Sequence, residues 1–214
     1  MGIDGDIARI TAAAEMLPEA QASYLESGFI MNLLETVLGY QMSTTAVVRA
    51  LQTFKDNRWD EVRTLDQLEN LFDRFPDDKE GNLGLARHLW GYDLWTRAHQ
   101  LRNLAGYFRS IGVVDQPSLR RWAARAQFKR DFEGRVRGLG LAVFQWLVMR
   151  QGVETVKPDV HVHRFVAAAL GRRVTDREVI ALVETAARDL GIKACQLDWR
   201  IWEASRSGAL PYPT

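Results

Sequence analysis

The chain has 214 residues, 47% of them hydrophobic and 10% aromatic, which is enough for one domain or two small lobes with a buried core. No apolar run reaches the roughly 18 residues that a membrane span needs, and no basic-then-apolar leader opens the chain, so we expect a soluble intracellular protein, cytoplasmic or nuclear. The single cysteine, Cys195, excludes an internal disulfide framework and any multi-cysteine zinc or iron–sulfur site within this chain.

The formal net charge of +1 hides an uneven distribution of charge along the chain. Residues 1–100 hold 9 basic and 16 acidic side chains, a net charge of −7, whereas residues 101–214 hold 19 and 11, a net charge of +8. This asymmetry points to an anionic partner for the second half, although runs of charge are more often simply solvated surfaces.

Almost every segment shows helical periodicity, so the sequence predicts an all-α protein. Apolar residues predict helices over 30–38, after the start signal at 43–45, over 94–108 and over 197–204. Thr175 and Glu178 form a capping-box pattern before another apolar stripe. Short loops are expected at 76–84, 112–117 and 152–158.

A Gly-x-Gly turn lies between a short helix expected at 131–136 and an apolar helix expected from Leu141. Two glycines so close permit a tight hairpin with positive φ, and the amides that begin the second helix favour an anion. Arg135 and Arg137 flank this turn, which therefore suits a phosphate group. A plain turn between two helices is the alternative explanation of the pattern.

Asp159 lies where a helix is expected to begin. Pro158 disfavours helical angles at Lys157, and Asp159 then occupies the N-cap position. A capping aspartate needs no further role, so this position alone does not establish catalysis.

Together the two motifs resemble those of the helix-hairpin-helix DNA glycosylases, the superfamily of endonuclease III and adenine glycosylase. That family has a hairpin of the form Leu-Pro-Gly-Val-Gly-x-Lys-Thr-Ala, followed by a helix and a loop ending Val-Asp-Thr-His-Val-x-Arg. The corresponding segments here are Val-Arg-Gly-Leu-Gly-Leu-Ala at 136–142 and Pro-Asp-Val-His-Val-His-Arg at 158–164. A weaker likeness is Leu-Gly-Tyr-Gln-Met-Ser-Thr at 38–44, where the family has Leu-Ser-x-Gln-x-Thr.

The resemblance implies two helical lobes flanking a DNA-binding cleft. A central helical barrel would span 28–153, with the helix-hairpin-helix at 130–151, and the second lobe would combine 1–27 with 154–214. Asp159 would be the catalytic carboxylate. Contacts with DNA would come from the following residues: Gly138, Leu139, Gly140, Arg137, Gln41, Lys157 and Arg164. For Arg164, pairing with a helix carboxylate is an equal alternative.

Departures from the family pattern narrow the expected chemistry. The family lysine that attacks the sugar corresponds to Ala142, so we expect a monofunctional glycosylase that uses water, without lyase activity. The family's iron–sulfur cluster is not expected, and the resemblance allows a Na⁺ or K⁺ ion at the hairpin backbone but no metal held by side chains. The alternative is a DNA-binding protein of the same fold that has lost catalysis.

The expected substrate is double-stranded DNA with a damaged or mismatched base, bound by a monomer. The sequence does not identify the base. Tyr40, Trp90 and Tyr92, with Trp95 nearby, are candidates to stack on a flipped base, although aromatic residues at such spacings more often belong to the core. His161 is expected to support the loop rather than to transfer protons.

Overall fold

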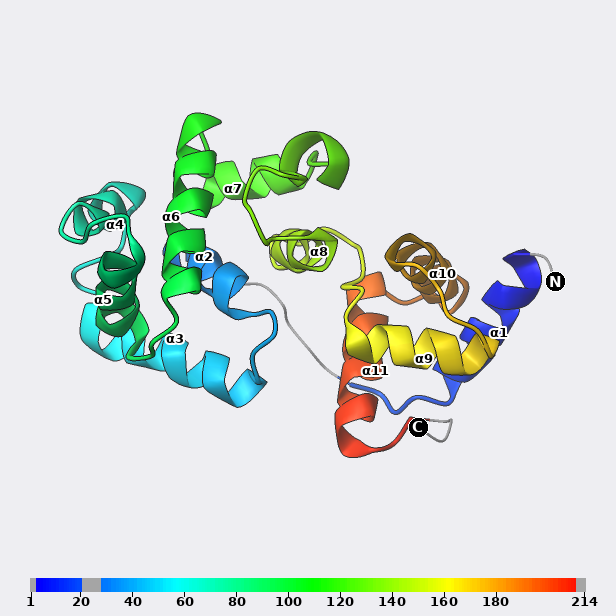
Figure 1. The fold of residues 1–214 in the computed structure, drawn as a ribbon. Coiled ribbons are helices and arrows are strands. Elements are labelled where there is room, and N and C mark those ends of the chain that lie inside the picture. Colours follow the sequence, from blue (N-terminus) through cyan, green and yellow to red (C-terminus); the bar gives the residue numbers. More distant parts are fainter. Residues whose placement is uncertain (1–2, 21–27, 211–214) are drawn as a thin grey trace. The chain divides into compact units, whose positions relative to one another are not determined.

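The computed structural model describes residues 3–20 and 28–210, and every regular element in these ranges is a helix (Figure 1). The all-α prediction is therefore confirmed. The helices are α1 (Ile3–Glu15), α2 (Phe29–Leu38), α3 (Thr44–Arg58), α4 (Leu65–Phe72), α5 (Lys79–Trp90), α6 (Trp95–Ser110), α7 (Gln116–Ala123), the π-helix η1 (Phe128–Phe132), α8 (Leu141–Met149), α9 (Val160–Leu170), α10 (Asp176–Asp189) and α11 (Ala194–Ser207). None of the described helices is long and apolar enough to cross a membrane.

The chain divides into two compact units. Unit 1 comprises Met1–Leu25 and Val148–Thr214, and unit 2 comprises Glu26–Leu147. The hairpin and the Gln41 loop belong to unit 2, whereas Asp159 belongs to unit 1.

Unit 1 is built around one apolar core. Helix α1 packs against α9 and α10, and α11 packs against the same two helices. Their apolar faces meet at Ile10, Phe165, Val183 and Ile201, all of them 0% exposed. This core supports the start of α9, where Asp159 lies.

Unit 2 is organised around α6, which packs against α2, α4 and α5 (Figure 1). The predicted apolar stripe is the reason, because Leu101, Leu104 and Phe108 recur at helical spacing and are each fully buried. Helix α3 packs in turn against α2 and α5.

An aromatic cluster joins α6, α7, η1 and α8. The Phe108 and Trp122 rings meet edge to face with their centroids 5.0 Å apart, and the Phe132 and Phe144 centroids are 5.5 Å apart. Trp122 also contacts Phe144 at 6.0 Å. Aromatic pairs at such distances each add about 0.5–1.5 kcal/mol beyond the area they bury, so the cluster anchors the irregular segment that precedes the hairpin.

Several predicted helix starts are confirmed. Ser43 accepts a hydrogen bond from the Ala46 N–H at the start of α3, and Thr175 with Glu178 forms the capping box of α10. The predicted loop at 76–84 is wrong in its second half, because the Asp78 carboxylate accepts from the Gly81 N–H (2.8 Å) and starts α5 there. Glycine at position 81 lets the start of α5 pack closely against the Pro76 backbone, since a Cβ there would lie 1.9 Å from the Pro76 carbonyl oxygen.

The short helix expected at 131–136 is also wrong. The helical element before the hairpin is η1, which ends at Phe132. Glu133 leaves helical geometry with ψ 124°, and Gly134 follows at φ +73°. The Phe132 ring packs against Trp122 and Phe144, and these tertiary contacts outweigh the local preference of residues 131–136 for a helix.

Thr175→Ala is expected to lower the free energy of unfolding by about 1 kcal/mol, because it removes the side-chain acceptor of the α10 capping box. Chemical denaturation measures the loss. Thr185→Ala is the matched control: Thr185 lies inside the same helix, and its change should cost less than about 0.5 kcal/mol. Equal losses in the two variants would contradict the capping role.

Candidate nucleic-acid interface and catalytic carboxylate

The hairpin turns at Gly138, which has φ +85°. A Cβ at Gly138 would lie 2.6 Å from the Gln100 Nε2 atom, so a side chain is disfavoured both by the backbone angle and by the space. Val136 and Leu139 are buried at 1% and 3% exposure, while Arg137, Gly138 and Gly140 are exposed. Two apolar side chains thus fix the hairpin to unit 2 and leave its tip open to solvent.

The two glycines of the hairpin have different roles. Gly140 has neither a positive φ nor any atom within 4 Å of a built Cβ, so the space beside it is open. It directly precedes α8, whose first-turn amides have no acceptor within the helix. The expected contact through the Leu139 amide is not supported, because that N–H donates to the Val136 carbonyl oxygen at 3.2 Å. The open amides begin at Gly140.

Gln41 has a strained backbone. Its φ of +55° is the only positive value at a non-glycine residue in the described ranges, and its side chain is exposed. Such strain costs about 1–3 kcal/mol and persists only where neighbouring structure enforces it. Here Arg97 enforces it: its Nη2 donates to the Tyr40 carbonyl oxygen (2.8 Å), and its guanidinium lies 3.6 Å from the Tyr40 ring centroid.

Gln100 connects this loop to the hairpin. Its Nε2 donates to the Tyr40 hydroxyl (2.6 Å) and to the Arg137 carbonyl oxygen (3.3 Å). Its Oε1 accepts from the Tyr40 hydroxyl (2.9 Å) and from Arg97 (3.2 Å). Burial lowers the pKa of the Arg97 guanidinium below its ordinary value. One buried polar network on α6 therefore sets the conformations of two expected DNA-binding segments.

Sequence reasoning missed both Arg97 and Gln100. They are polar residues on the buried face of α6, 8% exposed each, in line with the apolar stripe. A polar pair at i and i+3 on an apolar face is a signal that could have found them, since buried polar groups need partners.

Asp159 is the N-cap of α9, as predicted. Its Oδ1 accepts hydrogen bonds from the backbone N–H groups of His161 (2.8 Å) and Val162 (3.3 Å). Its Oδ2 lies 3.9 Å from the Lys157 Nζ, and the side chain is 22% exposed. One carboxylate oxygen is thus fixed by helix amides, and the other lies beside a cation at a position open to solvent.

The loop before Asp159 is attached to two helices of unit 1. The Lys157 N–H donates to the buried Asp198 carboxylate of α11 (2.9 Å), and the Thr155 hydroxyl donates to Glu184 of α10 (2.7 Å). Asp198 was not anticipated from the sequence. The loop contacts position the Asp159 backbone independently of its side chain.

The other residues of the aspartate motif differ in their surroundings. The His161 Nδ1 lies 2.7 Å from the Ser205 Oγ, a contact that holds the ring against α11. Arg164 is exposed on α9 and forms no ion pair within the described ranges. Its guanidinium is therefore available to an external anion.

The aromatic residues proposed to line a base pocket differ in how far their side chains are exposed to solvent. Trp90 is 1% exposed and belongs to the core of unit 2, so its ring is closed to a flipped base in this conformation. Tyr40 is partly exposed but its ring is covered by Arg97, and Tyr92 is also partly exposed. Trp95 is 36% exposed at the start of α6.

No group of His, Cys, Asp and Glu side chains in the described ranges is arranged to hold a metal ion. The Val136 and Arg137 carbonyl oxygens of the hairpin each accept one hydrogen bond and keep a second lone pair, so a monovalent cation at the hairpin backbone stays a prediction. Burial, with Glu154 close by, raises the pKa of the Cys195 thiol, which disfavours a nucleophilic thiolate.

A family model described as a domain of unknown function (DUF8548) matches residues 34–206. The chain belongs to this family. The DUF8548 match includes the Gln41 loop, the hairpin and Asp159, and so extends over parts of both units. No curated protein and no solved structure matches the chain.

Gly138→Ala is expected to lower the free energy of unfolding by about 1–3 kcal/mol, because the alanine would adopt a left-handed angle against Gln100. Gly140→Ala is the matched control and should change stability by less than about 0.5 kcal/mol. Denaturation curves of both variants measure the difference. A tolerated alanine at 138 would show that the left-handed turn is not required.

Proposed function

We propose that this protein is a monofunctional DNA glycosylase, which hydrolyses the N-glycosidic bond of a damaged or mismatched base flipped out of the duplex. The observation that carries the proposal is the geometry of Asp159, a partly exposed carboxylate held by two amides at the start of α9. The surrounding motif supports it through its resemblance to the helix-hairpin-helix glycosylases.

The chemistry follows from what breaks in the reaction. When the C1′–N bond breaks, the bonding electrons leave with the base and positive charge develops on the deoxyribose. An anionic carboxylate beside C1′ stabilises this charge, and it also accepts a proton from the water that attacks C1′. Asp159 would perform both steps, with the Oδ1 contacts fixing the orientation of its Oδ2.

Ala142 supports hydrolysis by water rather than attack by an amine, since it offers no nucleophile at the family's lysine position. The remaining amine near the carboxylate is the Lys157 ammonium, 3.9 Å from the Asp159 Oδ2. Its positive charge suits a neighbouring phosphate of the DNA strand.

The DNA-binding part of the proposal is supported by three exposed features of unit 2. These are the strained Gln41, the open amides from Gly140 and the flanking Arg137. Helix N-terminal amides and an arginine are ordinary partners of backbone phosphate, and an exposed strained residue is typical of a functional loop.

The central test compares wild type with Asp159→Asn on end-labelled duplexes that each carry one lesion. Asparagine is as good an N-cap as aspartate, so the variant should fold while losing about 100-fold or more of its activity. Strand breaks should appear only after hot alkali, because a monofunctional enzyme leaves an abasic site. Asp78→Asn is the matched control, since Asp78 caps α5 in the same way, and it should retain activity.

Each other outcome has a definite meaning. Breaks without alkali, together with a borohydride-trapped adduct, would assign lyase chemistry to an amine and contradict the role of water. No product from any lesion, despite salt-sensitive binding of DNA, would support the non-catalytic DNA-binding alternative.

Gly140→Ala tests the hairpin contact separately. A methyl group in the open space beside Gly140 should obstruct an approaching phosphate and weaken duplex binding about tenfold, equivalent to about 1.4 kcal/mol, with stability unchanged. Fluorescence anisotropy with a labelled undamaged duplex measures the affinity. The control is Gly106→Ala, which lies in equally open space on α6; equal affinity of the two variants would argue against contact at Gly140.

A further inference from the structure

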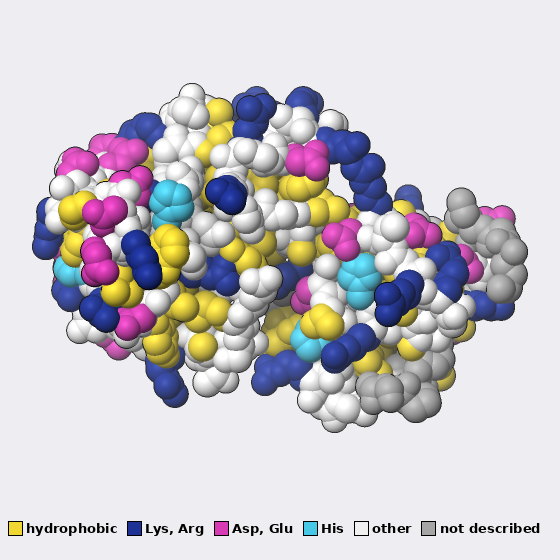
Figure 2. Space-filling model, in the orientation of Figure 1, with side chains coloured by type: hydrophobic (Ala, Val, Ile, Leu, Met, Phe, Trp, Pro, Cys, Tyr) yellow, Lys and Arg dark blue, Asp and Glu magenta, His cyan; other side chains and the backbone are white. Residues whose placement is uncertain are grey.

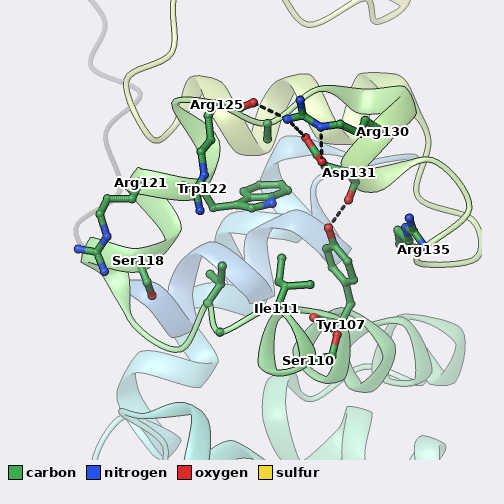
Figure 3. Close-up of a pocket in the computed structure, with 13 residues that line it drawn as sticks. Tyr107, Ser110, Ile111, Ser118, Arg121, Trp122, Arg125, Arg130, Asp131 and Arg135 are labelled. Atoms are coloured by element: carbon green, nitrogen blue, oxygen red, sulfur yellow. Dashed lines mark hydrogen bonds and ion pairs between the residues drawn. The ribbon is translucent and has the colours of Figure 1, made fainter.

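A pocket of about 580 Å³ lies in unit 2 between the end of α6, α7 and η1 (Figure 3). Neither the hairpin tip, residues 137–140, nor Asp159 belongs to its lining. The chain around it is strongly basic, since residues 120–137 contain seven Arg and Lys side chains and two acidic ones. Figure 2 shows dark blue side chains gathered over α7 and the segment that follows it.

Asp131, the acidic residue in the lining of the pocket, forms an ion pair with Arg130. Arg130 makes a bidentate contact with Asp131, Nε to Oδ1 and Nη2 to Oδ2, both 2.7 Å. These hydrogen bonds hold the pKa of the Asp131 carboxyl below its ordinary value, so the pair stays ionised near neutral pH. The Arg130 Nη2 also donates to the Arg125 carbonyl oxygen (2.9 Å), which ties η1 to the chain after α7.

Three further arginines line the pocket. Arg121, Arg125 and Arg135 are exposed, and none forms an ion pair or a side-chain hydrogen bond with a residue in the described ranges. In Figure 3, Arg121 and Arg135 lie on opposite sides of Trp122, and the Arg125 side chain extends along it. The pocket therefore presents three exposed guanidinium groups. Asp115 attracts Arg121 and Asp131 attracts Arg125 electrostatically, without a contact ion pair.

Two lining residues attach the pocket to the interior of unit 2. Trp122 is 6% exposed and belongs to the aromatic cluster, and the Tyr107 hydroxyl donates to the Asp131 carbonyl oxygen. Burial raises the pKa of Tyr107, which keeps this donor protonated. The planar donors of the guanidinium groups match the oxygens of a phosphate.

We propose that this pocket is a second phosphate-binding site, which holds the backbone of the same DNA that the hairpin contacts. A nucleic-acid backbone is favoured over a small phosphorylated ligand for two reasons. The arginines extend from 121 to 135 along one basic segment, and the buried Trp122 offers no ring face for a base to stack on. Arg135 also lies three residues before Gly138, so pocket and hairpin are continuous in the chain.

This inference rests on the proposed binding of DNA but not on catalysis. The test is the affinity of an undamaged, labelled 20-bp duplex over a series of salt concentrations. Arg121→Gln/Arg125→Gln should weaken binding at least tenfold and reduce the log–log salt slope by about 2, roughly one unit for each lost phosphate contact. Arg173→Gln/Arg177→Gln removes the same charge from exposed positions of unit 1 and should leave the slope within about 0.5 of wild type.

A lysine double variant shows whether loss of positive charge or loss of folded structure causes the effect of the glutamine double variant. Arg121→Lys/Arg125→Lys keeps both positive charges and should keep the salt slope of wild type. Thermal unfolding of every variant shows whether unit 2 is intact; Arg121 and Arg125 are exposed, so no shift is expected. If the Arg121→Gln/Arg125→Gln variant has the same salt slope as the Arg173→Gln/Arg177→Gln control, the proposed second phosphate site is overturned. The proposed hairpin contact would be unaffected by that result.

Two other results would also overturn the proposal. Binding of inorganic phosphate by the pocket, measured by calorimetry and lost in the glutamine pair, with unchanged DNA affinity would assign it to a small anion. Absence of salt-dependent DNA binding by wild type would overturn the proposed function together with the second site. Retained cleavage at saturating enzyme by the glutamine pair would support a role in binding alone.

Discussion

The backbone of Gly138 is the constraint on which the rest of the hairpin depends. Its left-handed angle turns the chain into α8, and the space that a side chain would occupy is taken by the Gln100 amide. That amide also bonds to the Tyr40 hydroxyl, and Arg97 beside it holds the Tyr40 carbonyl oxygen. A single polar network under the surface therefore determines the shape of two exposed loops that are far apart in the sequence.

The aromatic cluster also fixes the conformation of the chain around the hairpin. Phe132 and Phe144 flank the turn in the sequence, and both pack with Trp122. Side chains packed in this way resist small displacements, because interiors are close-packed and cannot shift without losing contacts. The arginines around the pocket are themselves exposed, but the backbone that carries them adjoins this packed cluster.

Unit 1 places its candidate carboxylate by a different means. The Asp159 side chain is fixed by amides of α9, while the backbone just before it is held by Asp198 of α11. A capping interaction alone explains why a helix begins there. The combination of a cap, a buried anchor and a neighbouring Lys157 leaves one oxygen of the carboxylate facing a cation and solvent, and this arrangement supports the chemistry we propose.

The sequence by itself determined the all-α class, several helix starts and the positions of the two motifs, because helical periodicity and capping are local properties of neighbouring residues. It predicted the Asp159 cap and the Thr175 capping box for the same reason. Tertiary structure decided what depends on distant partners. In place of the expected helix at 131–136 the chain forms η1 and a turn, and Trp90 lies in the core. The Leu139 N–H donates to the Val136 carbonyl oxygen, and Gln100 donates to the backbone of the hairpin. These outcomes follow from packing and from the pairing of buried polar groups, which no local pattern specifies.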